Sequence, residues 1–80
     1  ALKIAVECGR TGGTLPCAFN AANEEAVYAF LDGKIKYMDI VKTIEYVVGR
    51  HQNILQPVLE DIENADASAR CAAKDFLSNL

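Results

Sequence analysis

The chain has 80 residues, of which 51% are hydrophobic, and its 8 Lys and Arg against 11 Asp and Glu give a net charge of -3. This length fits one small domain and leaves no room for a second. Nucleic acid is not expected as a partner, because the few basic residues form no patch along the sequence. A membrane is not expected either, since no apolar run approaches the ~20 residues that span a bilayer.

The first predicted helix ends at a pair of glycines. Apolar residues recur from Leu2 to Gly9 with the i, i+3, i+4, i+7 spacing of an amphipathic helix. Gly12 and Gly13 then end this helix, because glycine adopts a left-handed backbone at no steric cost. The run Gly12-Gly13-Thr14 ahead of a second helix has some likeness to an anion-binding loop, but it lacks further glycines and a following Lys. We interpret it as a helix stop and a helix cap.

The second predicted helix has Thr14 as its N-cap, Pro16 in its first turn, and runs to about Asp32, where Gly33 closes it. At about 100° per residue, one broad arc is apolar and carries Leu15, Ala18, Phe19, Ala22, Ala26, Ala29 and Phe30. The least apolar side carries Ala21, Glu25, Tyr28 and Asp32.

A mixed face lies beside that apolar arc, where Asn20, Asn23 and Glu24 share one side of the helix with Val27 and Leu31. Solvent exposure is the ordinary explanation for such polar residues. The two adjacent apolar side chains favour a contact surface instead. The helix is therefore expected to be used on two sides, one for its own bundle and one for another partner.

The third predicted helix has Asp39 as its N-cap, after a connection over residues 34–38. Its apolar stripe consists of Ile40, Ile44, Val47, Val48 and His51. His51 lies near the negative end of this helix, so we interpret it as a contact with the helix dipole. No Cys, Ser or Asp lies at a spacing that would make it a catalytic base.

The fourth predicted helix follows a polar loop over residues 52–56 and has Pro57 at its first position. Its apolar stripe consists of Val58, Leu59, Ile62, Ala65, Ala69, Ala72, Ala73, Phe76 and Leu80. Polar residues weaken the middle of the stripe, so a break near Ala65 with Asp66 as a fresh cap is an alternative. Four helices with short connections predict an all-α fold, a small antiparallel helical bundle of about four helices.

No group of residues predicts catalysis. Glu24 and Glu25 are adjacent on a helix and so point about 100° apart, which prevents them from acting together on one substrate. The scattered Cys8, Cys17 and Cys71, with a single His in the chain, do not have the spacing of a zinc site. We interpret them as reduced thiols of a cytosolic or plastid-like compartment. We expect no catalytic, cofactor-binding or metal-binding residue among the 80.

Two blocks of sequence nevertheless resemble a known family. The first is GRTGGTLPCAFNAANEEAVYAFLDGKIKYMDI, in which Gly12, Gly13, Thr14 and Pro16 precede the run Asn-Ala-Ala-Asn-Glu at residues 20–24. The second is LEDIENADASAR at residues 59–70. Both resemble the C-terminal helical domain of 1-deoxy-D-xylulose 5-phosphate reductoisomerase, and together the resemblance covers nearly the whole chain.

The resemblance implies that residues 1–80 are a single helical domain, a C-terminal fragment of a larger multidomain enzyme. For the full-length enzyme it implies a homodimer that rearranges and reduces a sugar phosphate with NADPH and Mg or Mn, in the non-mevalonate pathway to isoprenoid precursors. A bacterial cytoplasm or a plastid would be its location. None of the family's catalytic, NADPH or metal residues falls on this sequence, so no cofactor is expected within this fragment.

In such an enzyme, Asn20, Asn23, Glu24, Val27 and Leu31 are predicted to contact the remaining domains of the same polypeptide and to brace them. The alternative is a free-standing helical module that binds another protein through Asn20, Asn23, Val27 and Leu31.

Overall fold

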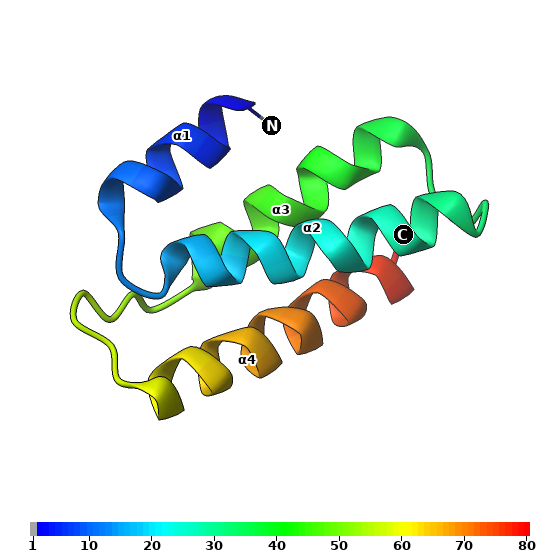
Figure 1. The fold of residues 1–80 in the computed structure, drawn as a ribbon. Helices are drawn as coiled ribbons and strands as arrows, with labels where there is room; N and C mark the ends of the chain where they lie inside the picture. Colours follow the sequence, from blue (N-terminus) through cyan, green and yellow to red (C-terminus); the bar gives the residue numbers. More distant parts are fainter. Residues whose placement is uncertain (1) are drawn as a thin grey trace.

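The structure, a computed structural model, describes residues 2–80 apart from the side chain of Leu2. Its helices are α1 (Leu2–Thr11), α2 (Leu15–Leu31), α3 (Tyr37–Arg50) and α4 (Leu59–Ser78) (Figure 1). Residues 2–80 contain no strand. The predicted all-α bundle of about four helices is therefore confirmed.

Helix α2 lies at the centre of the bundle and packs against α1, α3 and α4. Consecutive helices run in opposite directions (Figure 1). Helices α2 and α4 consequently run in the same direction, and this pair makes the most extensive contact in the bundle.

Alanine dominates the buried surface between these helices. From α2 the buried residues are Ala18, Ala21, Ala22 and Ala26, and from α4 they are Ala65, Ala69 and Ala73. Larger side chains come from α3, where Ile40, Ile44 and Val47 are buried as the predicted stripe requires. Because alanine projects only one carbon from the backbone, the backbones of α2 and α4 approach closely, and the side chains of α3 fill the remaining core.

The predicted distribution of residues around α2 was wrong on one side. Ala21 is fully buried and the side chain of Glu25 is only 15% exposed, although both were placed on the least apolar side. Conversely, Phe30 is exposed although it was placed on the apolar arc. Arg70 of α4 binds Glu25, so α4 covers this side of α2. The last turn of α2 lies at an end of the bundle (Figure 1).

The glycines end the helices as predicted. Gly12 and Gly13 have φ values of 72° and 68°, and Gly33 beyond α2 has 74°, all in the left-handed region that glycine tolerates. The amide of Gly12 donates to the carbonyl of Cys8 at 3.0 Å, which satisfies one of the free carbonyls at the end of α1.

Two predicted helix starts are displaced. Helix α3 begins at Tyr37, two residues before the predicted cap Asp39, whose Oδ2 accepts the N–H of Lys36 at 2.9 Å. Likewise, Asp61 Oδ2 accepts the N–H of Val58 at 3.0 Å ahead of α4. A carboxylate at the third helical position accepts the N–H of the residue just before the helix. An acidic residue near a helix start can therefore be the N-cap or the third helical residue, and the sequence alone does not distinguish the two.

Helix α4 also differs from its prediction in continuity and exposure. It is unbroken from Leu59 to Ser78, so Pro57 precedes the helix and the alternative break near Ala65 was wrong. The Asp66 carboxylate binds Arg70 one turn later at 2.9 Å instead of capping a new helix. The early part of the predicted stripe is not in the core, because Val58, Leu59 and Ile62 are exposed, as is Leu80 at its end.

Candidate functional site

The predicted contact face of α2 is partly exposed and partly engaged. Asn20 and Leu31 are exposed, Leu31 to 75%, whereas Asn23 and Val27 are half-buried and Val27 packs against the core. Within residues 2–80, no side-chain hydrogen bond involves Asn20 or Asn23. The structure thus leaves both amides available, while Glu24 is bound within the domain.

Arg70 of α4 binds the two adjacent glutamates of α2 and one carboxylate of its own helix. Its Nη2 donates to Glu24 Oε1 at 2.7 Å, its Nη1 to Glu25 Oε2 at 2.9 Å and its Nε to Asp66 Oδ2 at 2.9 Å. The bonds to Asp66, Glu24 and Glu25, in that order, raise the pKa of Arg70 above its ordinary value. Arg70 and its three carboxylates, hereafter the Arg70 cluster, fasten α4 to α2.

Glu24 and Glu25, which were not expected to act together on one substrate, both bind the guanidinium of Arg70. Their Cα–Cβ bonds diverge along the helix, but both side chains are long enough to bend toward a common partner. The nitrogens of a guanidinium point in different directions within one plane, so they can meet carboxylates that arrive from different sides. The arrangement is an ion-pair cluster, with its carboxylates bound to a cation rather than directed at a substrate.

We expect Arg70→Met to lower the melting temperature by several degrees, because Glu24, Glu25 and Asp66 then face one another without a cation. Salt shortens the range of charge repulsion, so the loss should shrink when NaCl is raised from about 0.1 M to about 1 M. Thermal unfolding followed by circular dichroism at both concentrations checks this. Lys74→Met, on the same helix and outside any ion pair within residues 2–80, is the control. A loss that does not depend on salt, or that the control shares, contradicts the prediction.

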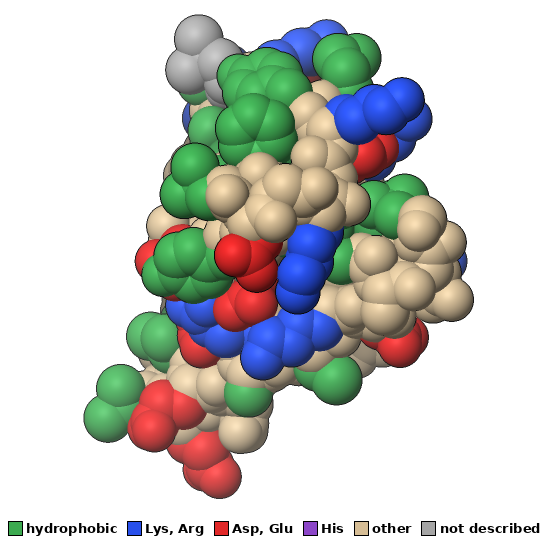
Figure 2. All heavy atoms as spheres, turned by 90° about the vertical axis from the view of Figure 1, so that its right-hand side faces the viewer, with side chains coloured by type: hydrophobic (Ala, Val, Ile, Leu, Met, Phe, Trp, Pro, Cys, Tyr) green, Lys and Arg blue, Asp and Glu red, His purple; other side chains and the backbone are tan. Residues whose placement is uncertain are grey.

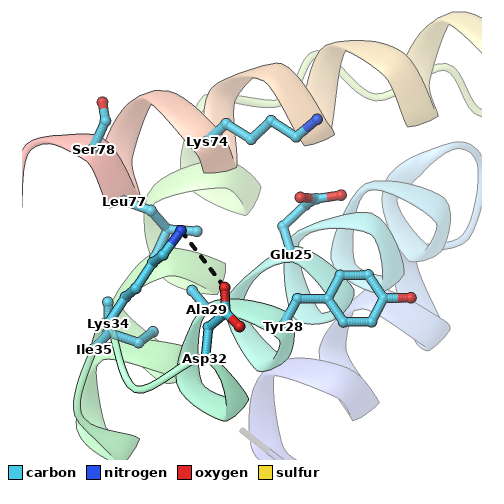
Figure 3. Close-up of a pocket in the computed structure, with 9 residues that line it drawn as sticks. All are labelled: Glu25, Tyr28, Ala29, Asp32, Lys34, Ile35, Lys74, Leu77 and Ser78. Atoms are coloured by element: carbon cyan, nitrogen blue, oxygen red, sulfur yellow. Dashed lines mark ion pairs between the residues drawn. The ribbon is translucent and has the colours of Figure 1, made fainter.

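A shallow hollow of about 320 Å³ lies between α2, the α2–α3 connection and α4 (Figure 3). Side chains of both signs line it, with Glu25 and Asp32 on one side and Lys34 and Lys74 on the other. Lys34 Nζ lies 3.6 Å from Asp32 Oδ2 in an exposed ion pair, and the Ser78 hydroxyl donates to a carbonyl of its own helix. Figure 2, which views this end of the molecule, shows acidic and basic side chains lying next to each other. The side chains that line the hollow therefore include no nucleophile paired with a general base, which a catalytic site of that kind needs.

A second group of polar residues joins the α1–α2 connection to the loop after α3. The Thr14 side chain is fully buried, and its Oγ1 lies 2.7 Å from His51 Nε2, accepts the N–H of Ile54 at 3.1 Å and donates to Asn53 Oδ1 at 3.2 Å. Asn53 Oδ1 also accepts the N–H of Leu15 at 2.9 Å. We call Thr14, His51, Asn53 and Ile54 the Thr14 junction. Thr14 is the N-cap residue of α2 as predicted, but its hydroxyl makes no capping bond, and Asn53 of the distant loop accepts the N–H of Leu15 instead.

The Thr14 junction has the atoms of a nucleophile and a base but the surroundings of a structural contact. A hydroxyl next to an imidazole is a familiar catalytic pair, yet Thr14 has no exposed surface and its oxygen already bonds to the loop. Burial lowers the pKa of His51. The first N–H groups of α2 are also occupied, since the Thr14 N–H donates to the Ile54 carbonyl at 3.0 Å and Leu15 donates to Asn53. The Gly12-Gly13-Thr14 run is thus a helix stop in a fixed connection.

The described part of the chain holds no group of three or more His, Cys, Asp or Glu side chains that could bind a metal ion. None of its helices combines the length and the hydropathy of a membrane span. The three cysteines are free thiols, with Cys8 buried, Cys17 half-buried and Cys71 exposed. Burial raises the pKa of the Cys8 and Cys17 thiols, which lowers their reactivity as nucleophiles.

Comparison with known proteins identifies the family. Residues 1–72 match the model of the DXP reductoisomerase C-terminal domain. The chain is 48% identical over 77 residues to the 1-deoxy-D-xylulose 5-phosphate reductoisomerase of Geobacillus kaustophilus and 51% identical over 77 residues to that of Lysinibacillus sphaericus. Each alignment covers 96% of this chain and 20% of the relative. The enzyme of a Synechococcus strain is 52% identical over 69 residues, which are 86% of this chain and 18% of that protein.

The chain thus spans about a fifth of the length of the curated relatives it matches. These matches favour the reductoisomerase interpretation over the free-standing module, and the resemblance carried by residues 9–40 and 59–70 is confirmed. By its match over residues 1–72, this chain belongs to the family of DXP reductoisomerase C-terminal domains.

Proposed function

We propose that this chain is the noncatalytic helical domain of a 1-deoxy-D-xylulose 5-phosphate reductoisomerase and that it braces the catalytic part of the same polypeptide. The family match over residues 1–72 carries the proposal. The full-length protein would then be an NADPH-dependent enzyme of isoprenoid precursor biosynthesis by the non-mevalonate route, with Mg or Mn as its metal. We propose a homodimer located in the bacterial cytoplasm or a plastid.

The residues of this chain do not fit the cofactors of the proposed enzyme. Residues 2–80 offer no cluster of metal-ligating side chains. The N–H groups at the start of α2, where a phosphate of a dinucleotide could bind, are already bonded to Asn53 and Ile54. We therefore assign NADPH and the metal to the part of the enzyme that the relatives have beyond this chain, and no step of the reaction is placed on these residues.

The direct test uses the full-length enzyme that contains this sequence. We expect it to oxidise NADPH only when 1-deoxy-D-xylulose 5-phosphate and Mg or Mn are both present, which absorbance of NADPH measures. Absence of turnover under these conditions overturns the proposal. The 80-residue domain by itself should not bind NADPH in a fluorescence titration, and measurable binding would contradict the assignment of the cofactor to the rest of the enzyme.

We infer that the brace uses the face of α2 that carries Asn20, Asn23, Glu24, Val27 and Leu31. The amides of Asn20 and Asn23 are available for hydrogen bonds to backbone groups of a neighbouring domain. Leu31 supplies exposed apolar area. Glu24 uses Oε1 for Arg70 and so presents its other oxygen from a fixed position. Val27 packs against the buried core and so anchors this face to the bundle.

We expect Asn20→Ala with Asn23→Ala to lower the free energy of unfolding of the full-length enzyme by about 1–3 kcal/mol, the sum of two lost hydrogen bonds. Turnover should fall with it, while KM for the sugar phosphate changes little, because these residues do not touch substrate. Steady-state kinetics and thermal unfolding measure both effects. The same double variant of the 80-residue domain is the control, and its stability should stay unchanged. Unchanged kinetics together with an unchanged melting temperature of the full-length enzyme would refute this use of α2.

A further inference from the structure

Five apolar side chains are exposed together where the α3–α4 loop passes into α4. The exposed fractions are 69% for Leu55, 63% for Val58 and 72% for Leu59, with Ile54 and Ile62 at 42% and 41%. We call these five residues the 54–62 surface; the segment lies at the left and lower left of the bundle (Figure 1). An apolar patch of this kind on a folded domain marks an interaction site.

The backbone that carries the 54–62 surface is held in place. The N–H of Ile54 donates to Thr14 Oγ1 at 3.1 Å, and its carbonyl accepts the Thr14 N–H at 3.0 Å. The N–H of Val58 donates to Asp61 Oδ2 at 3.0 Å. The side chains are thus presented from a fixed loop and a helix start, so a partner that covers them pays little ordering entropy.

The chain segment that carries the 54–62 surface has charged side chains of one sign. Residues 51–69 include four acidic side chains and no Lys or Arg. Glu60 and Glu63 are exposed and form no ion pair with any residue in the described range 2–80. A second copy docked by two-fold symmetry would bring these carboxylates toward their own equivalents. The surface therefore fits a partner whose apolar side chains are bordered by Lys or Arg.

A hollow of about 340 Å³ adjoins the surface at Ile54 and offers a place for such a basic side chain. Asp61 and Asn64 line it. Asp61 Oδ2 is bonded to the Val58 N–H, while no hydrogen bond to Oδ1 occurs among residues 2–80. Arg50 lines the hollow too, with its positively charged guanidinium stacked on the ring of Tyr46 at 3.9 Å.

We propose that the 54–62 surface and the adjoining hollow are the docking site for a segment of the remaining reductoisomerase polypeptide that carries apolar side chains bordered by Lys or Arg. The inference rests on the proposed function, because this chain spans about a fifth of the length of its relatives and the partner lies in the rest. This contact is separate from the face of α2 and would hold the domain at a second place.

The test compares two double variants of the full-length enzyme by hydrogen exchange and mass spectrometry. Leu55→Glu with Leu59→Glu should raise amide exchange across residues 54–62 by about tenfold or more, because two apolar contacts are replaced by carboxylates. Tyr37→Glu with Met38→Glu, 70% and 68% exposed at the opposite end of the bundle, is the matched control. All four side chains are exposed within the domain, so neither variant disturbs its core. Equal exchange in the two variants and the wild type would overturn the proposal.

Two further measurements identify the occupant. Glu60→Lys with Glu63→Lys should also raise exchange over 54–62, by about tenfold, if the partner is basic; exchange that stays unchanged or slows contradicts a basic partner. Protection that falls on dilution as dimers dissociate would make a second copy the occupant and overturn the proposal. If the wild-type enzyme does not oxidise NADPH in the presence of the sugar phosphate, the proposed function is refuted. This assay is independent of the hydrogen exchange of the variants, so failure of the proposed function and failure of the docking proposal are distinguished.

Discussion

Gly13→Ala should lower the free energy of unfolding by about 2–5 kcal/mol, the largest loss that we expect from any single substitution here. Gly13 has a φ of 68°, so a side chain there is strained before any contact is considered. A Cβ at this position would also overlap the Ile54 carbonyl oxygen and lie 2.7 Å from Asn53 Oδ1. Because Ile54 is held by the Thr14 junction, its backbone cannot move aside without breaking hydrogen bonds.

Gly12→Ala is the matched control for that substitution. Gly12 has almost the same backbone, with a φ of 72°, but a Cβ there would meet no atom within 4 Å. It should therefore cost only the left-handed strain, about 1–2 kcal/mol. Urea unfolding of both variants, followed by circular dichroism, separates strain from overlap. Equal losses in the two variants would show that the Ile54 carbonyl does not press on Gly13.

Thr14→Val should lower the free energy of unfolding by about 2–4 kcal/mol. Valine has nearly the shape of threonine, so packing is preserved while the hydroxyl is lost. The N–H of Ile54 and the ring of His51 then lose their hydrogen-bond partner at a part-buried site. Polar groups left without a partner destabilise the folded state wherever water does not replace the missing bond.

Thr11→Val tests whether the Thr14 hydroxyl is special. Thr11 is exposed, and its Oγ1 donates to the Glu7 carbonyl at 2.9 Å within the same helix. Loss of this bond leaves groups that water can reach, so the stability should change by less than about 0.5 kcal/mol. If thermal unfolding shows similar losses for the two threonine variants, the Thr14 junction contributes no more than an ordinary surface hydrogen bond.

Local sequence signals predicted the helices of this domain well. The left-handed glycines at positions 12, 13 and 33 and the periodic Ile40, Ile44 and Val47 are properties of short windows, and the structure confirms them. The errors at Asp39 and Pro57 have the same local origin. An acidic residue or a proline near a helix start satisfies the pattern at more than one position, so the boundary shifts while the helix remains.

Contacts between distant residues were beyond the reach of these signals. Asn53 caps a helix that begins 38 residues earlier, and Arg70 binds carboxylates 45 and 46 residues away. Each of these side chains, taken in its own window, looks like an ordinary polar surface residue. Their roles arise only from the packing of α4 and the α3–α4 loop against α2.

The same difference between local sequence signals and contacts of distant residues applies to the two proposed contact surfaces. Periodicity placed Asn20, Asn23 and Leu31 on one side of α2, which is a property of a single helix. Periodicity also assigned Leu59 and Ile62 to the core, because an apolar stripe indicates that something covers it without saying what. The structure shows that the bundle itself leaves these two residues exposed.

The alanines between α2 and α4 set a spacing as well as a core. Helix axes separate by an amount that depends on the side chains between them, and the buried residues of α2 and α4 are all alanines. The face of α2 and the 54–62 surface belong to opposite partners of that pair. A larger side chain at Ala69 would therefore push α2 and α4 apart. The distance between the two proposed docking surfaces would increase, although the residues of each surface would stay the same.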